Sequence, residues 1–152
     1  MKKIILTMAA LGVSVSGASA NTVEFRGAAC ITSVNAACAP FGWTVGDCML
    51  MRYSPRSLGT NGPATELSLF GQSFSDNYSL ATGNPVGTVF QPVVGIHVGR
   101  TGYSFSPKMR FTSQSPAALG TSKSVTLAGN ITNFDDSTGC TVGFRASGTR
   151  RP

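Results

Sequence analysis

The sequence predicts an all-β fold, an antiparallel β-sandwich of about seven to nine short strands stapled by disulfides. No stretch keeps the period of an amphipathic helix, whereas apolar and polar residues alternate with period two in several short stretches. Clusters rich in Gly, Pro and Asn separate these stretches, as turns do in antiparallel sheets. A small closed β-barrel is the runner-up, because it would bury the same alternating positions.

Residues 1–20 have the pattern of a bacterial secretory signal peptide. Lys2 and Lys3 precede the apolar run Ile4–Val15, and Ala18-Ser19-Ala20 matches the small-residue cleavage site. The apolar run is shorter than the ~20 residues that span a bilayer. We therefore expect cleavage after Ala20, export to the periplasm or the outside of the cell, and no membrane span in the mature chain.

The remaining residues fit one domain. We place it at residues 21–146 and expect residues 147–152 to form a flexible basic tail. The chain has 12 basic and 6 acidic side chains, and its arginines are scattered rather than gathered in a stripe. This pattern disfavours a nucleic-acid partner. A transmembrane β-barrel is disfavoured because Lys108, Arg110 and Arg145 occupy the outward positions of their strands.

Four cysteines in an exported chain predict two disulfides. Cys30 and Cys48 flank the turn-like segment AACAPFG symmetrically, so a hairpin would place them opposite each other and leave Cys38 for Cys140. The rival pairing, Cys38 with Cys48 and Cys30 with Cys140, stays open. A metal site is disfavoured, because the sequence has no C-x-x-C pair and a single histidine. We expect no cofactor.

Each expected strand carries one apolar face. Within Val94–Val98 the aliphatic residues alternate with Gly95 and His97, and the glycines on the histidine's side leave space for a ligand or another backbone. Pro107 marks a bend or edge in a half-buried strand that runs through Tyr103–Thr112. The expected strands are Val23–Arg26, Cys30–Asn35, Trp43–Tyr53, Thr65–Phe70, Phe74–Leu80, Val86–Gln91, Val94–Val98, Tyr103–Thr112, Val125–Ile131 and Cys140–Ala146.

Catalysis has little support in the sequence. His97 is the only histidine, and no nucleophile motif such as G-x-S-x-G is present, so a histidine that packs in the sheet is the favoured interpretation. Nothing in the sequence pairs the carboxylates, and Asp135-Asp136 is better explained by a hairpin turn than by a calcium loop. A secreted hydrolase that uses His97 is retained as an alternative.

One segment is a weak candidate for binding. Arg52, Tyr53 and Arg56 combine two guanidinium groups with an aromatic ring, and Trp43 could add to them. The competing interpretation, with Tyr53 in the core and solvated arginines, is stronger. The loop Ser54–Ala64 could also present itself to a target, as in a small inhibitor-like or toxin-like domain.

These observations together predict an exported, non-enzymatic β-domain. We expect it to act as an envelope- or surface-associated binding or structural module, whose partner is a protein or a cell-envelope glycan. The inhibitor-like domain and the secreted hydrolase are the alternatives.

Overall fold

The computed structural model describes residues 23–55, 65–80, 93–100 and 102–152, and most of them lie in the strands of one antiparallel sheet. Eight strands in chain order close this sheet into a barrel, and the short strand β6 pairs antiparallel with the last residues of β5. The strands are β1 (Phe25–Val34), β2 (Cys48–Ser54), β3 (Thr65–Phe70), β4 (Phe74–Leu80), β5 (Val93–Gly99), β6 (Gly102–Ser104), β7 (Lys108–Ser115), β8 (Ser124–Thr132) and β9 (Thr141–Arg150).

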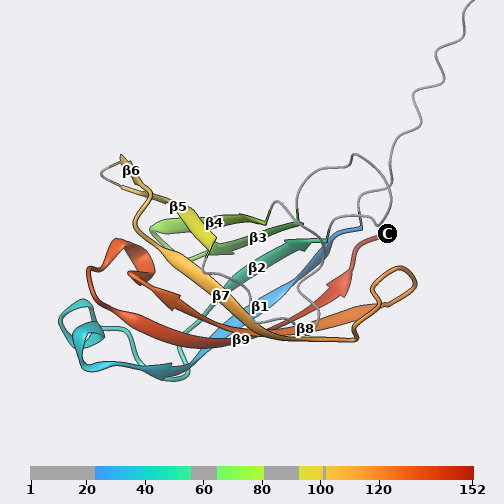
Figure 1. The fold of residues 1–152 in the computed structure, drawn as a ribbon, viewed down its shortest axis with the longest axis horizontal. Coiled ribbons are helices and arrows are strands. Elements are labelled where there is room, and N and C mark those ends of the chain that lie inside the picture. Colours follow the sequence, from blue (N-terminus) through green and yellow to red (C-terminus); the bar gives the residue numbers. More distant parts are fainter. Residues whose placement is uncertain (1–22, 56–64, 81–92, 101) are drawn as a thin grey trace, which may run out of the picture.

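The all-β prediction is confirmed, with the barrel in place of the sandwich. The closing pair β5–β7 is short, because only Val93 with Met109 and Val94 with Lys108 are in register. The Gly95 N–H adds a bond of 2.7 Å to the Pro107 carbonyl. In Figure 1, β3 and β4 lie along the top and β8 and β9 along the bottom, so the two walls face each other across a common core.

The interior is filled by side chains from all around the barrel. The sequence correctly assigned the buried faces of the strands that carry Met49, Leu67, Val125 and Phe144, because strict alternation puts every second side chain inside. The largest fully buried side chains are Tyr53, Tyr78, Phe25, Phe111, Phe134, Phe144, Ile31, Leu67, Leu69, Met109, Leu127 and Ile131.

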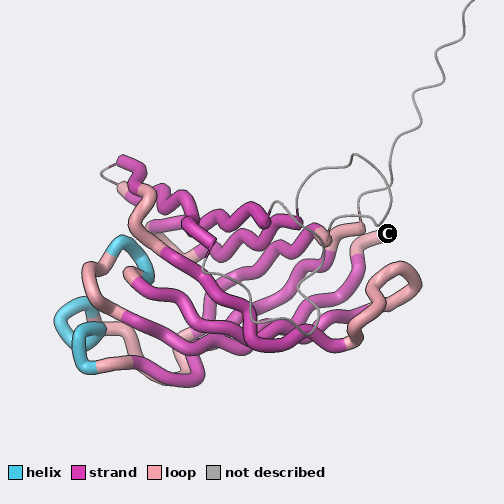
Figure 2. The backbone as a smooth tube through the Cα atoms, viewed as in Figure 1, coloured by secondary structure: helices cyan, strands magenta, loops and turns pink. Residues whose placement is uncertain are grey.

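Both disulfides lie at one end of the barrel, and their predicted pairing is confirmed. Cys30 and Cys48 are register partners of β1 and β2, with Cα atoms 4.1 Å apart. Cys38 lies in the 3-10 turn η1 (Ala36–Phe41) and is bonded to Cys140 at the start of β9. Figure 2 shows this disulfide end, with its helical turns, opposite the C-terminus.

The predicted tail is wrong, because β9 continues to Arg150. Its last residues lie between β1 and β8 and pair with both. The Arg150 N–H donates to the Lys123 carbonyl, and the Arg151 N–H donates to the Glu24 carbonyl, both at 2.8 Å. Backbone pairing on both sides orders this segment even though its side chains are polar. The domain therefore extends from 146 to at least 150.

The strand expected at Tyr103–Thr112 is interrupted. The residues between Ser104 and Lys108 belong to no strand. Because of this break, the aromatic side chains before it point to the opposite side of the sheet from the apolar side chains after it. Tyr103 and Phe105 are 74% and 61% exposed, whereas Met109 and Phe111 are buried. Alternation carries over from one stretch to the next only if the strand is continuous.

Two smaller differences concern the first hairpin. β1 is one strand of ten residues rather than two shorter ones, and β2 begins at Cys48 rather than at Trp43. Asp47 explains the later start, because its carboxylate accepts hydrogen bonds from the backbone and hydroxyl of Thr44 and closes a turn there.

Some predictions fall on residues that the structure does not describe. These are the signal peptide, the possible strand Val86–Gln91 and most of the loop Ser54–Ala64. No helix among the described residues is long and apolar enough to cross a membrane.

Candidate functional site

The single histidine lies between two carboxylates at the disulfide end. Asp76 of β4 and His97 of β5 are register partners whose side chains point into the barrel. His97 Nδ1 is 2.7 Å from Asp76 Oδ1, and His97 Nε2 is 3.9 Å from Asp135 Oδ1. Asp135 belongs to η2 (Phe134–Asp136), in the connection between β8 and β9. The cluster therefore joins segments that are far apart in the sequence.

Burial dominates the electrostatics of this cluster. Asp76 is fully buried, and this desolvation raises its pKa. The hydrogen bond and charge of His97, the backbone N–H of Asp135 and the Tyr78 hydroxyl act in the opposite direction. Burial also raises the pKa of Asp135, while His97 lowers it. Because an ionised carboxylate can only accept, His97 Nδ1 donates to Asp76 whenever that group is charged.

Aromatic rings pack around the histidine and close the disulfide end. Phe74 stacks on His97 with ring centroids 5.9 Å apart, and Trp43 makes edge contacts with Phe74 and Phe134 at 5.7 and 4.9 Å. The indole nitrogen of Trp43 makes no hydrogen bond to a described residue. Its N–H still lies near enough to Asp135 to favour the ionised carboxylate.

The open space predicted beside His97 is occupied. A Cβ at Gly95 would lie 2.4 Å from the Tyr78 ring, and a Cβ at Gly99 would lie 2.7 Å from His97 Nε2. The two glycines therefore make room for aromatic rings of the protein itself and not for a ligand. Because Gly95 and Gly99 have no Cβ atoms, the Tyr78 and His97 rings can both pack against β5.

This geometry holds the histidine in place, and among the described residues it brings no nucleophile to the imidazole. The His97 side chain is 9% exposed, and no described hydroxyl or thiol is hydrogen-bonded to Nε2. The nearby hydroxyls of Ser104 and Ser106 instead donate to Asp136, which lowers the pKa of that carboxylate. Nucleophilic catalysis would require one of these serine hydroxyls to be hydrogen-bonded to the imidazole.

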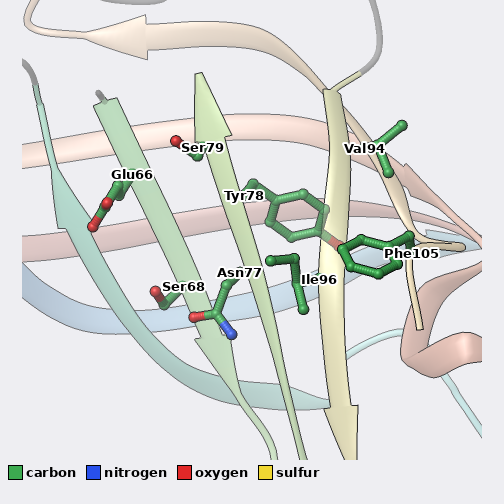
Figure 3. Close-up of a pocket in the computed structure, with 8 residues that line it drawn as sticks. All are labelled: Glu66, Ser68, Asn77, Tyr78, Ser79, Val94, Ile96 and Phe105. Atoms are coloured by element: carbon green, nitrogen blue, oxygen red, sulfur yellow. The ribbon is translucent and has the colours of Figure 1, made fainter. Parts of the chain in front are cut away.

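A second candidate site lies on the outer face of β3, β4 and β5. A groove of about 530 Å³ lies there, and Figure 3 shows the residues that line it. Glu66 and Ser68 of β3 form one wall, and Asn77 and Ser79 of β4 form the floor. The opposite wall is apolar and consists of Val94, Ile96 and Phe105, with the Tyr78 ring beneath it.

This apolar wall differs from the neighbouring outer surface. Val94, Ile96 and Val98 point outward from β5 and are 51%, 43% and 46% exposed. Outward positions on β7 instead carry Lys108 and Arg110. An antiparallel sheet normally presents polar side chains to water, so a row of aliphatic side chains marks a candidate contact surface.

The binding residues predicted from sequence do not form one surface. Tyr53 is fully buried, and its hydroxyl donates to Gln114 at 2.7 Å, so it cannot join Arg52 outside the barrel. Trp43 is half-buried at the disulfide end, and Arg56 lies outside the described residues. The stronger interpretation of Tyr53, as a core residue, is confirmed.

Arg52 instead belongs to a basic cluster that the sequence did not indicate. Arg26 and Arg52 are register partners on β1 and β2, and both are ion-paired with Glu24, Arg52 at 2.8 Å. They line a hollow of about 600 Å³ together with Arg151. Only the register between the two strands brings these charges together.

The sequence pattern also did not indicate that the residues of the groove form one site. The alternation at Val94–Val98 did indicate two distinct faces, but nothing local shows that the aliphatic face points outward. The chain matches no protein-family model, and neither curated proteins nor solved structures give a match. A functional assignment therefore depends on the geometry of these two sites.

Proposed function

We propose that this protein is an exported, non-enzymatic binding module that holds a protein partner on the outer groove of β3–β5. The observation that carries the proposal is the half-exposed aliphatic wall of Val94 and Ile96 beside a hollow of about 530 Å³. The interior is filled with side chains, so the outer face is where a partner can bind.

The lining of the groove favours a protein over a cell-envelope glycan. Aliphatic and aromatic side chains with a polar rim are typical of protein interfaces. The polar groups, Glu66, Ser68, Asn77 and Ser79, lie on the floor and on the opposite wall. Such an arrangement suits a partner that inserts apolar side chains and satisfies polar groups beside them.

Export is supported by the pattern of residues 1–20 and by the two disulfides, which suit an oxidising compartment. The absence of catalysis is supported by the buried position of His97, which has no described nucleophile within hydrogen-bond reach. Its role is to tie β4 and β5 to η2.

Site-specific photocrosslinking in exporting cells tests the proposed face. A photoreactive amino acid replaces Ile96 in one sample and Arg145, which points outward from β9, in the control. We expect a protein adduct from position 96 and none from position 145. Equal adducts from both positions, or none from either, would contradict the proposed binding face.

Export needs its own measurement. We expect the recovered mature protein to begin at Asn21 and to be found outside the cytoplasm. Recovery of a cytoplasmic chain with an intact N-terminus and free thiols would reject export.

A further inference from the structure

We propose that the hollow lined by Arg26, Arg52 and Arg151 is a further binding site, which holds a small free anion with an apolar body, an alkyl phosphate or an alkyl carboxylate. The hollow lies on the outer face of β9, β1 and β2 and reaches the end of β3. It shares no lining residue with the groove of β3–β5. The inference therefore goes beyond the proposed function and does not depend on it.

Glu24, the residue before β1, brings the three arginines to one place. Its carboxylate is ion-paired with the Nε atoms of Arg26 and Arg52, which are register partners on β1 and β2. Its backbone carbonyl accepts the Arg151 N–H at 2.8 Å, so the chain after β9 is held beside the start of β1 (Figure 1). The side chains of all three arginines line one hollow of about 600 Å³.

The hollow has an excess of positive charge. Burial acts to raise the pKa of Glu24, but the hydrogen bonds and charges of Arg26 and Arg52 outweigh it and lower that pKa. Glu24 is therefore ionised near neutral pH, and arginine is always charged. Three positive guanidinium groups around one negative carboxylate leave two positive charges for a ligand to neutralise.

The hydrogen-bond donors of these arginines are only partly used. Each guanidinium has five N–H donors, and Glu24 is contacted only through the Nε atoms of Arg26 and Arg52. Their Nη groups and the Arg151 guanidinium make no hydrogen bond or ion pair with a described residue. Guanidinium groups bind carboxylates and phosphates through two parallel N–H···O bonds. The remaining donors therefore fit an oxyanion.

An apolar surface adjoins the arginines on the same face of the sheet. Leu50 and Phe70 are register partners on β2 and β3, and both line the hollow. Leu50 and Arg52 are two residues apart on β2, so their side chains point to the same side. Leu50 is 68% exposed and Phe70 is 37% exposed. An inorganic anion would leave this surface in water, whereas an anion with an apolar body would cover it.

An anionic membrane surface is the competing occupant, because it also combines negative charge with apolar chains. A bilayer contacts the protruding side chains of a protein and leaves a hollow between them unfilled. The volume of about 600 Å³ instead lies within the range of small-molecule sites. The observations therefore favour a single free molecule.

Isothermal titration calorimetry of the oxidised mature protein with octyl phosphate and with octanoate tests the inference. We expect at least one of them to bind with a dissociation constant below about 1 mM. The one that binds more tightly identifies the preferred head group. Inorganic phosphate should bind at least about tenfold more weakly than octyl phosphate, because it lacks the apolar body. Dissociation constants above about 1 mM for both amphiphiles, or equal affinity for inorganic phosphate, would overturn the inference.

Variants of the hollow test its residues. Arg151→Gln removes a charge that pairs with no described carboxylate, and it should weaken binding of the better ligand at least about tenfold. Leu50→Ser should weaken binding of that ligand by about threefold or more and leave the binding of inorganic phosphate unchanged.

Arg145→Gln is the matched control, because it removes an outward arginine of β9 that does not line the hollow. It should leave the affinity within about twofold of the original. Thermal unfolding of each variant shows that the barrel is intact. Equal weakening by Arg151→Gln and Arg145→Gln would indicate attraction to net charge alone and would overturn the inference, as would Arg151→Gln without effect.

Sedimentation with vesicles of anionic phospholipid distinguishes a membrane from a free anion. Binding of the soluble amphiphile, with no vesicle binding that depends on Arg151, supports the inference. Vesicle binding that Arg151→Gln abolishes, from a protein that binds neither octyl phosphate nor octanoate, would overturn it in favour of a membrane. Because the hollow and the groove share no residue, either result leaves the test of the proposed function unchanged.

Discussion

His97 Nδ1 lies 2.7 Å from Asp76 Oδ1, and this contact joins β4 to β5 inside the barrel. Asp76 is fully buried, so its charge depends on the histidine and on its two other hydrogen-bond donors, the Tyr78 hydroxyl and the Asp135 backbone N–H. A buried carboxylate that loses its partner strongly destabilises the folded state, so the free energy of unfolding should be sensitive to this pair.

Replacing His97 with alanine should destabilise the protein by about 3 kcal/mol or more, because Asp76 is left buried without its main partner. The double variant Asp76→Asn with His97→Ala should be less destabilised than His97→Ala alone, since the amide carries no charge. Urea unfolding of the oxidised proteins near neutral pH measures both free energies. Equal losses in the single and double variants would contradict a charge-based role.

The serine hydroxyls that bind Asp136 should stabilise the fold in a pH-dependent way. Hydrogen bonds from Ser104 and Ser106 hold the pKa of Asp136 below its ordinary value of 3.8. A lowered folded pKa contributes stability that is present above the unfolded pKa and is lost as the pH falls through the folded pKa. The double variant Ser104→Ala with Ser106→Ala should therefore differ from the parent near pH 6, and the difference should shrink toward pH 2.

Unfolding free energies at the two pH values give this difference directly. Asp136→Asn is the control background, because an amide does not titrate and the effect of the serine substitutions should then be independent of pH. A difference of the same size at both pH values in the parent background would rule out this linkage.

The two disulfides should differ in their contribution to stability. Cys38 and Cys140 close a loop of 102 residues, whereas Cys30 and Cys48 close one of 18. On the chain-entropy model these correspond to about 5 and about 3 kcal/mol. Paired alanine substitutions should show the larger loss for Cys38–Cys140, by thermal unfolding under non-reducing conditions. The reverse order would show that native packing around Cys48 outweighs loop entropy.

Gly95→Ala should destabilise the barrel by about 1–3 kcal/mol, because the new methyl group would overlap the buried Tyr78 ring. Gly120→Ala is the matched control, since a Cβ there meets nothing within 4 Å. Thermal unfolding of both variants measures the comparison. A neutral Gly95→Ala would mean that the Tyr78 ring can move aside without cost.

The sequence by itself determined the all-β class and the inward faces of the regular strands, and it favoured the observed disulfide pairing without excluding the rival one. Alternation fixes which side chains share a face, and the symmetric positions of Cys30 and Cys48 around one turn place them opposite each other. These properties follow from neighbours within one strand or one hairpin, so local patterns are sufficient to predict them.

Only the tertiary structure decided how the sheet closes and which face of β5 is outside. Barrel closure depends on the short pairing of Val93 and Val94 with β7, which no local pattern indicates. Val94 and Ile96 face outward because the inner side of β5 must make room for the Tyr78 ring, which Gly95 permits. The contact of His97 with Asp76 and the neighbouring positions of Arg26 and Arg52 likewise arise from register between strands. These relationships depend on pairing between strands that are far apart in the sequence, and the residue pattern within one strand does not specify its pairing partner.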